Sequence, residues 1–233
     1  MPAPGSETYP SPFPTFDHDG AQIFRSAIGP AELEAIEKAV EDLPADRAGI
    51  RLYGITQLCA LLQASGVIGR IAASALGSNC RPVRAILFDK TAATNWGLQW
   101  HQDRTIVVKE KIEVEGFGPW TVKQGLLHVE PPFELLAGMA TLRIHLDPVP
   151  ETNAPLLVAP GSHKLGRIPV NEVPDVVERH GVYVCTASRG DIWLYATPIL
   201  HASEASLDPF HRRVLQVDYA TADLPSGLEW LGV

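Results

Sequence analysis

The sequence is short of cysteine and of basic residues. Its three cysteines, Cys59, Cys80 and Cys185, are an odd number without CxxC spacing, which indicates reduced thiols rather than a disulfide framework and offers no zinc site. Lys and Arg number 19 against 27 Asp and Glu, for a net charge of -8. A nucleic-acid surface needs clustered Lys and Arg to neutralise phosphates. We therefore expect a small-molecule partner and no nucleic acid.

Long hydrophobic runs and targeting signals are also missing. No segment approaches the roughly 20 apolar residues that cross a bilayer. Residues 1–16, "MPAPGSETYPSPFPTF", are rich in proline and lack the basic start and apolar run of a signal peptide. We expect a cytoplasmic protein without a membrane partner. Its 233 residues, 45% of them hydrophobic, suffice for one core and predict a single domain over residues 1–233.

The hydrophobic pattern changes near residue 80. Residues 29–43, "GPAELEAIEKAVEDL", begin with a proline and carry apolar residues at helical spacing, which predicts an amphipathic helix. Residues 55–77 predict a more buried helix that stops at Gly77. From Arg81 onward, β-rich runs between turn residues predict strands: "VRAILF", "RTIVVK", "MATLRIHL", "LLVA", "VYVCTA", "DIWLYA" and "RVLQVDYA". We expect residues 1–80 to be a leader and helical support, and residues 81–233 an antiparallel barrel or jelly roll.

One short segment, "GLQWHQDRTIVV", places His101 and Asp103 two positions apart. Side chains at i and i+2 of a strand share one face, so the two should point together. Two histidines and one carboxylate on one face are a ligand set of non-haem iron. His201, after the apolar run "GDIWLYA", is the best second histidine, because early and late strands of a jelly roll meet. The alternative is a histidine paired with a neighbouring acid for structural reasons.

The same spacing recurs in "RIHLDP", with His145 and Asp147. Pro148 follows Asp147 directly, which favours a turn at the end of a strand. We therefore interpret His145 as an ordinary strand histidine and assign the metal to the first pair.

Arg212 begins the run "RRVLQVDYA", 11 residues after His201. A guanidinium at the base of the pocket could bind a dicarboxylate through two charge-assisted hydrogen bonds while the other end of the acid chelates the metal. Ser203 could add a hydroxyl donor to the same carboxylate. Strand alternation sends only one of Arg212 and Arg213 inward, and the pattern does not decide which.

The segments "WHQD", "LRIHLDPVPETNAPLLVAPGSHKLG" and "GDIWLYATPILHAS", followed by Arg212, resemble the phytanoyl-CoA dioxygenase family of Fe(II)- and 2-oxoglutarate-dependent oxygenases. The likeness runs from about Arg81 to Tyr219. It implies a mainly β fold, a double-stranded β-helix (a cupin-like jelly roll) with the N-terminal helices packed on it. It also implies roles for individual residues: iron ligands His101, Asp103 and His201, and 2-oxoglutarate ligands Arg212, Ser203 and Trp120.

Two further features follow from the resemblance. The "PGSHKLG" segment is a structural hallmark of the family, so His163 is expected to serve turn formation and packing. In "NAPL" the family usually has Asn-Gly, and Ala154 and Pro155 therefore leave the local turn type open.

The activity implied is an Fe(II)-, 2-oxoglutarate- and O2-dependent oxidation of a C–H bond. Halogenating members of the family lack the carboxylate at the position of Asp103, so its presence favours hydroxylation or a related oxidation. The alternative is a catalytically inactive jelly-roll protein that binds a metal or a small molecule.

Candidates for substrate binding were chosen only by their proximity in sequence to the metal strand, the following connection and the next strand. They are Gln99, Trp100, Arg104, Lys123, His128 and Arg143. Each also suits a solvated or packing role, and the basic members point to a small, carboxylated or otherwise anionic metabolite.

Residues 110–134 form a long connection with little periodicity, and such segments are often functional. Its glycines could act as hinges, and Phe117 and Trp120 could seal out water. We expect a lid there, with a rigid packed connection as the alternative.

Overall fold

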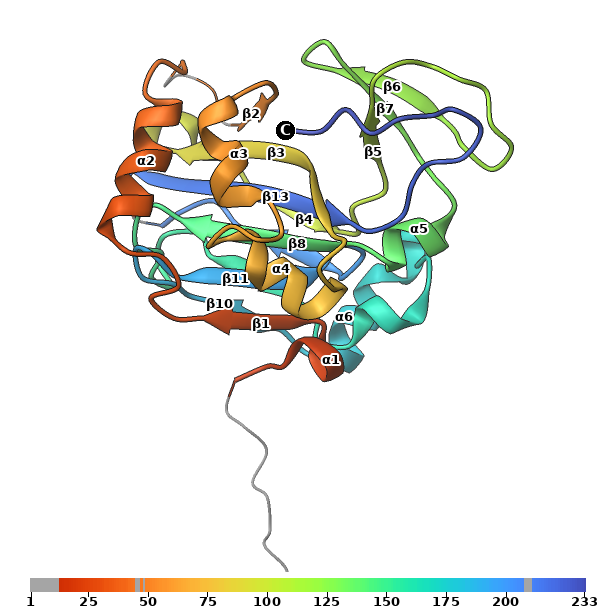
Figure 1. Cartoon of the computed structure of the whole chain (residues 1–233). Coiled ribbons are helices and arrows are strands. Elements are labelled where there is room, and N and C mark those ends of the chain that lie inside the picture. The colour runs from red at the N-terminus through yellow and green to blue at the C-terminus, as the bar shows by residue number, and fades with distance from the viewer. Residues whose placement is uncertain (1–12, 45–46, 48, 208–210) are drawn as a thin grey trace, which may run out of the picture.

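The structure, a computed structural model, describes residues 13–44, 47, 49–207 and 211–233. Residues 1–12 of the proline-rich leader lie outside the described residues. The described chain is built around three antiparallel sheets, with helices over one face of the largest sheet (Figure 1). The predicted mainly β architecture of jelly-roll type, with N-terminal helices packed on it, is confirmed.

The sheets combine strands from distant parts of the chain. In spatial order, the six-stranded sheet contains β1 (Ala21–Phe24), β11 (Ile192–Ala196), β8 (Ala140–His145), β13 (Arg212–Ala220), β3 (Arg81–Lys90) and β2 (Gly49–Leu52). The four-stranded sheet contains β10 (Tyr183–Cys185), β9 (Leu156–Val158), β12 (His201–Ser203) and β4 (Leu98–His101). The small sheet contains β5 (Ile106–Val108), β7 (Leu126–Val129) and β6 (Trp120–Lys123). All seven β-rich runs therefore form strands. The edge strands β1 and β2 come from the region that the sequence assigned to leader and helices.

The helices are short. The α-helices are α1 (Phe16–Asp19), α2 (Pro30–Val40), α3 (Thr56–Leu62), α4 (Gly69–Leu76), α5 (Phe133–Ala137) and α6 (Val173–His180). The 3-10 turns are η1 (Ala92–Thr94), η2 (Ser162–Leu165) and η3 (Val170–Glu172). Within the described part of the chain, no helix combines the length and the apolar character that a bilayer crossing requires.

The single buried helix predicted over residues 55–77 is wrong, because the structure divides it into α3 and α4. Gly66 explains the break: a Cβ there would lie 2.3 Å from the carbonyl oxygen of Ala60. Only glycine permits so close an approach of the backbone. The predicted stop at Gly77 is confirmed, since its N–H closes the last turn of α4.

Strand alternation gives the six-stranded sheet two different faces. Ala140, Leu142 and Ile144 of β8 belong to the core that packs under α2, α3 and α4 (Figure 1). The intervening side chains of the same buried strand point to the other face. Among them, Arg143 lies opposite Gln216 of β13. The inner face of this sheet is therefore polar.

The four-stranded sheet covers part of that inner face. Leu156 and Val158 of β9 pack with Trp193 and Tyr195 of β11 in one buried cluster. His163, expected to serve packing, lies in η2 against Gly20, where a Cβ would be 2.2 Å from its Nδ1. The two sheets thus form a sandwich whose interior holds this apolar cluster beside the polar side chains of the inner face.

The connection over residues 110–134 is more regular than its sequence suggested. It contains β6 and β7, which pair with each other, and β7 also pairs with β5. Phe117 is buried in a cluster with Val129 and the C-terminal Trp230, and Trp120 packs against the same cluster. The two aromatic side chains expected to seal the pocket are therefore used in packing.

Candidate functional site

His101, Asp103 and His201 meet between the sheets. His101 ends β4, His201 begins β12, and the two are register partners in the four-stranded sheet. Their ring centroids lie 4.3 Å apart. Asp103 lies just beyond the end of β4 rather than within it. One potential ligand atom from each residue falls within 4.8 Å of the others, and no other group of three or more potential ligand residues meets this test in the described chain.

Backbone hydrogen bonds orient both imidazoles. His101 Nδ1 lies 2.7 Å from the carbonyl oxygen of Gln99, and His201 Nδ1 lies 2.9 Å from that of Ile199. A carbonyl oxygen can only accept, so each Nδ1 carries a hydrogen, and in a neutral imidazole the Nε2 then keeps its lone pair. This pattern of an orienting partner on the second ring nitrogen is typical of metal-binding histidines.

Protonation at neutral pH also suits a divalent cation. Burial, with a contribution from His101, lowers the pKa of His201 to about 4, so this imidazole is neutral. Burial acts to raise the pKa of Asp103, but the Arg84 guanidinium together with the other positive neighbours of this carboxylate holds its pKa below the ordinary value. Two imidazoles and one carboxylate therefore converge, which is the donor set that non-haem Fe(II) uses.

Arg84 connects Asp103 to a second buried carboxylate. Its Nη2 donates to Asp103 Oδ2 over 3.3 Å and its Nε donates to Asp218 Oδ2 over 2.5 Å. Thr141 Oγ1 donates to the other oxygen of Asp218 over 3.0 Å. Arg84 lies on β3 and is only 8% exposed. This network fixes the Asp103 carboxylate from behind.

The second His-x-Asp pair is separated by its surroundings. Asp147 accepts from the backbone N–H, Nε and Nη2 of Arg213, over 2.8 to 2.9 Å. His145 is buried on β8, and neither of its ring nitrogens has a hydrogen-bond partner. The side chains of this pair do not converge. The same contacts answer the open question about the two arginines, since Arg213 points outward and Arg212 inward.

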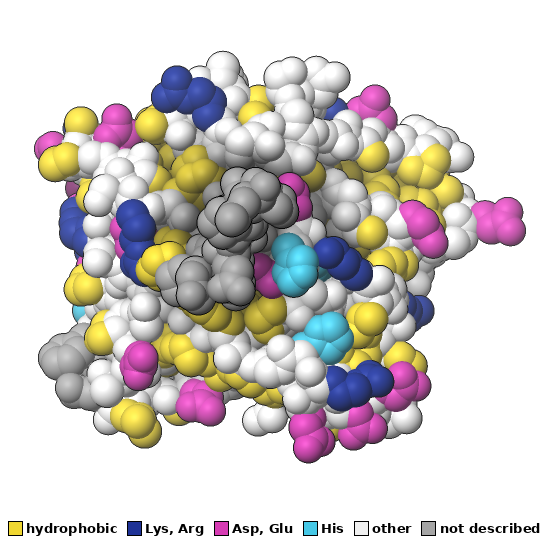
Figure 2. Space-filling view, turned by 90° about the horizontal axis from the view of Figure 1, so that it is seen from below, with side chains coloured by type: hydrophobic (Ala, Val, Ile, Leu, Met, Phe, Trp, Pro, Cys, Tyr) yellow, Lys and Arg dark blue, Asp and Glu magenta, His cyan; other side chains and the backbone are white. Residues whose placement is uncertain are grey.

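A cavity of about 610 Å³ opens above the three converging residues. Four of the substrate candidates, Trp100, Arg104, Lys123 and Arg143, line it. The lining contains only one acidic residue, Asp103, but five arginine and lysine residues: Arg51, Arg84, Arg104, Lys123 and Arg143. On the outer face shown in Figure 2, by contrast, acidic and basic side chains are interspersed. The cationic character belongs to the cavity of an otherwise acidic chain.

The two remaining substrate candidates do not line the cavity. Gln99 is exposed and contributes only its carbonyl oxygen, which orients His101. His128 is fully buried on β7, and burial lowers its pKa to about 4. Its Nδ1 bonds to the carbonyl oxygen of Leu126 over 3.0 Å. His128 therefore supports the small sheet.

Arg212 lies beside the cavity wall rather than in its lining. Its guanidinium, 2% exposed, donates to the carbonyl oxygen of Ala154, which also accepts from Ser203 Oγ over 3.2 Å. Ser203 lines the cavity. Ala154 has φ 51°, in the left-handed region that favours glycine, so the turn keeps that conformation although its residue is alanine.

Lys90 and Arg143 complete a buried cationic cluster with Arg212. Lys90 Nζ donates to Ser203 Oγ over 3.2 Å, and Lys90 is the register partner of Arg212. Burial and the neighbouring arginines lower the pKa of Lys90 to about 7, and burial and Arg143 lower that of Arg212 to about 9. None of the three forms an ion pair with a described carboxylate. Such a cluster is costly unless an anion binds there.

Sequence reasoning missed Lys90, Arg84 and Arg51. A signal was present for the first two, because Arg84 and Lys90 are an even number of residues apart in the apolar run of β3 and share its inner face. Arg51 lies on β2, and the hydrophobic pattern of the sequence did not predict a strand there.

Trp120 is not brought to the cavity. It lies against the cluster around Phe117 and Trp230, with Lys111 Nζ 5.6 Å from the centroid of its ring. Its Nε1 is buried without a hydrogen-bond partner.

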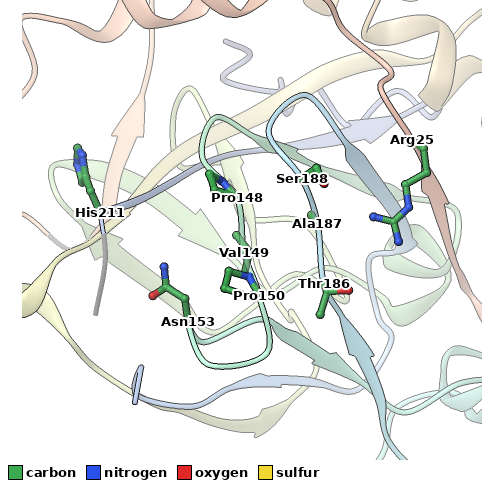
Figure 3. A pocket seen from close by; sticks show the side chains of 9 residues that line it. All are labelled: Arg25, Pro148, Val149, Pro150, Asn153, Thr186, Ala187, Ser188 and His211. Carbon is green, nitrogen blue, oxygen red and sulfur yellow. The ribbon is translucent and has the colours of Figure 1, made fainter. Parts of the chain in front are cut away.

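A second cavity, of about 490 Å³, lies away from the three converging residues (Figure 3). Its basic side chains are already paired: Arg25 Nη1 lies 2.7 Å from Asp191 Oδ2, and His211 Nε2 lies 2.8 Å from Asp89 Oδ1. It therefore lacks the uncompensated charge of the first cavity.

Comparisons with known proteins agree with this geometry. Residues 16–214 match the phytanoyl-CoA dioxygenase (PhyH) family. Ectoine dioxygenase of Sphingopyxis alaskensis is 23% identical over 237 aligned positions, which cover 84% of this chain and 71% of that protein.

Two solved structures share the fold. EctD from S. alaskensis with bound Fe has a TM-score of 0.66 and 20% identity, and the match covers 94% of this chain and 78% of that one. HygX from Streptomyces hygroscopicus with nickel and 2-oxoglutarate has a TM-score of 0.60 and 15% identity, and the match covers 88% of this chain and 84% of that one.

Proposed function

Since this chain belongs to the phytanoyl-CoA dioxygenase family, and is therefore an iron- and 2-oxoglutarate-dependent dioxygenase, we propose that it oxidises a C–H bond of a small anionic metabolite. In this proposal His101, Asp103 and His201 hold Fe(II). The observation that carries the proposal is the convergence of these three side chains, with both Nε2 lone pairs free. Bound iron with 2-oxoglutarate and O2 supplies the oxidising chemistry.

The co-substrate is assigned to the cationic cluster. Arg212 and Ser203 would bind the distal carboxylate of 2-oxoglutarate. Lys90, whose Nζ donates to Ser203 Oγ, lies close enough to be a further hydrogen-bond donor to this carboxylate. The cluster is buried and has no described carboxylate partner, so a bound carboxylate would offset the cost of its burial. Trp120 has no part in this assignment because it packs in the small sheet.

The substrate is expected to carry a negative charge. Five basic residues against one acidic residue line a cavity of about 610 Å³. This volume suits a small metabolite. Trp100, Arg104, Lys123 and Arg143 line the cavity and are the candidates for contacts with it.

The reaction is expected to be a hydroxylation or a related oxidation. Asp103 occupies the third ligand position, and Arg84 holds its carboxylate in place and ionised. The chain thus fills the position that a halide would need.

A screen of small carboxylated and phosphorylated metabolites tests this proposal. Each is incubated with Fe(II), 2-oxoglutarate and O2, and succinate release is measured together with the mass of the product. We expect one class of anionic compounds to raise succinate release and to gain the mass of one oxygen atom. The Asp103→Ala variant should abolish both signals. Binding of Fe(II) and 2-oxoglutarate without substrate-dependent succinate from any compound would favour an inactive binding protein.

A further inference from the structure

Two cationic side chains at the mouth of the cavity come from distant parts of the chain. Arg51 lies on β2 at the edge of the six-stranded sheet, and Lys123 is the last residue of β6. Both line the cavity. Neither side chain forms an ion pair or hydrogen bond with a described residue, and Arg51 Nε is buried without a partner. A buried donor of this kind costs free energy unless something binds it.

Gln124 holds the two cations side by side. Its Oε1 accepts from the backbone N–H of Arg51 over 3.1 Å, and its Nε2 donates to the carbonyl oxygen of Gly49 over 2.7 Å. These bonds tie the turn between β6 and β7 to the edge strand β2. Gln124 itself has φ 50°, a left-handed conformation that is unfavourable for a non-glycine residue. The chain thus maintains a strained turn that places two like charges together.

Among the described residues, no carboxylate forms an ion pair with either member of this pair. Burial lowers the pKa values of Arg51 and Lys123, the positive charge of Arg84 adds to the effect, and only Asp103 opposes it. In the proposed function Asp103 binds iron, and the distal carboxylate of 2-oxoglutarate lies at Arg212. Both negative groups are therefore engaged elsewhere. The positive charge at the cavity mouth is left for a third ligand.

We infer that Arg51 and Lys123 form an anion seat that binds the carboxylate, phosphate or sulfonate group of the primary substrate and orients its reactive carbon toward the metal. This inference rests on the proposed function and extends it by naming the residues that determine specificity. Charge-assisted hydrogen bonds from a guanidinium and an ammonium suit all three groups, with the planar guanidinium able to bind two oxygens at once.

Sulfate is a suitable probe because it presents the shared chemistry without a reactive carbon. Protein loaded anaerobically with Fe(II) and saturating 2-oxoglutarate is titrated with sulfate by calorimetry, with chloride keeping the ionic strength constant. The visible absorption of the same samples reports whether iron and 2-oxoglutarate have bound. Variants are Arg51→Gln, Arg51→Lys and Lys123→Gln. Lys109→Gln is the matched control, since it removes an exposed charge outside the cavity.

We expect Arg51→Gln and Lys123→Gln each to raise the apparent Kd for sulfate at least about tenfold, the effect of losing one charge-assisted hydrogen bond. Arg51→Lys should restore part of the affinity and Lys109→Gln should leave it unchanged. The absorption of the Fe(II) and 2-oxoglutarate complex should be the same in all variants. For a substrate found by the succinate screen, these variants should raise KM with little change in kcat.

The outcomes separate the two ideas. The anion seat would be overturned, and the dioxygenase assignment left intact, if the Fe(II) and 2-oxoglutarate complex absorbs normally but sulfate binds all variants equally. Normal absorption without any sulfate binding by the unaltered protein would lead to the same conclusion. If Arg51→Gln and Lys123→Gln lose sulfate affinity but no sample shows the absorption of the Fe(II) and 2-oxoglutarate complex, the anion seat is supported and the iron ligand assignment is overturned.

Discussion

Replacing Arg84 by methionine perturbs the charge balance behind the proposed iron site. Its guanidinium lies between the buried carboxylate of Asp218, at 2.5 Å, and the partly buried carboxylate of Asp103, at 3.3 Å. Methionine keeps much of the volume but removes every donor, so both carboxylates lose their cation. The pKa of Asp218 is already raised by burial, which shows that its charge is incompletely compensated even with Arg84 present.

The expected loss of stability is large. Removing one partner of a buried ion pair costs about 3–5 kcal/mol, because an uncompensated charge stays behind. Arg84→Met should therefore lower the free energy of unfolding by that amount. In the double variant Arg84→Met/Asp218→Asn, only Asp103 stays uncompensated. It should be more stable than Arg84→Met alone by at least about 1 kcal/mol.

Urea unfolding of metal-free protein at pH 7.5 measures these differences, and a common m-value would show that the folded state is comparable. Anaerobic titration with Fe(II) gives a second readout: Arg84→Met should weaken iron binding, since the Asp103 carboxylate loses its orienting partner. A loss below about 1 kcal/mol for Arg84→Met, or a double variant no more stable than Arg84→Met, would refute the account of this network.

Three other predictions follow from the structure. Arg212→Ala should raise the apparent Kd for 2-oxoglutarate at least about tenfold, from the loss of a charge-assisted hydrogen bond of roughly 1.5–3 kcal/mol, with unchanged affinity for iron. The control variant Arg213→Ala, at an outward-pointing residue, should bind 2-oxoglutarate as the unaltered protein does. Equal affinity of the two variants for 2-oxoglutarate would assign the carboxylate to other residues. The pKa of His128 is about 4 in the folded protein, against an ordinary value of 6.5. The contribution of the neutral imidazole to the free energy of unfolding is therefore fully present above pH 6.5 and is lost as the pH falls toward 4. Between pH 7 and pH 4 the unfolding free energy of the unaltered protein should fall by up to about 3 kcal/mol more than that of His128→Leu, and parallel curves would contradict the assignment. Residues 110–134 should resist limited proteolysis equally with and without Fe(II) and 2-oxoglutarate, because β6 and β7 are paired and Phe117 is buried; protection only in the loaded protein would restore the lid.

The strands of the core were predictable because they carry strong β-rich runs between turn residues. The edge strand β2 was not, since three of its four residues are only partly buried and the strand carries no clear alternation. The division of residues 55–77 into two helices depends on the close approach of Gly66 to α3, which is a contact in three dimensions that periodicity does not report. The hairpin of β6 and β7 was missed because three of the four residues of β6 are exposed.

The convergence of His101 and Asp103 was predictable from their spacing, although Asp103 lies beyond the strand rather than within it. Pairing of β12 with β4 brings His201 to them, as the jelly-roll expectation required. The cationic cluster was only partly visible, because the pairing of β3 with β13 is what places Lys90 opposite Arg212. Register between distant strands is set by the whole sheet and cannot be obtained from a local pattern.

The assignment of the iron site is tested most directly by the visible absorption that forms when Fe(II) and 2-oxoglutarate are added to the protein without oxygen. The variants to compare are His101→Ala, Asp103→Ala, His201→Ala and, as the control from the second His-x-Asp pair, His145→Ala. We expect the band in the unaltered protein and in His145→Ala, and its loss in the other three. A band that survives substitution of His101 or His201, or that is lost only in His145→Ala, would contradict the assignment.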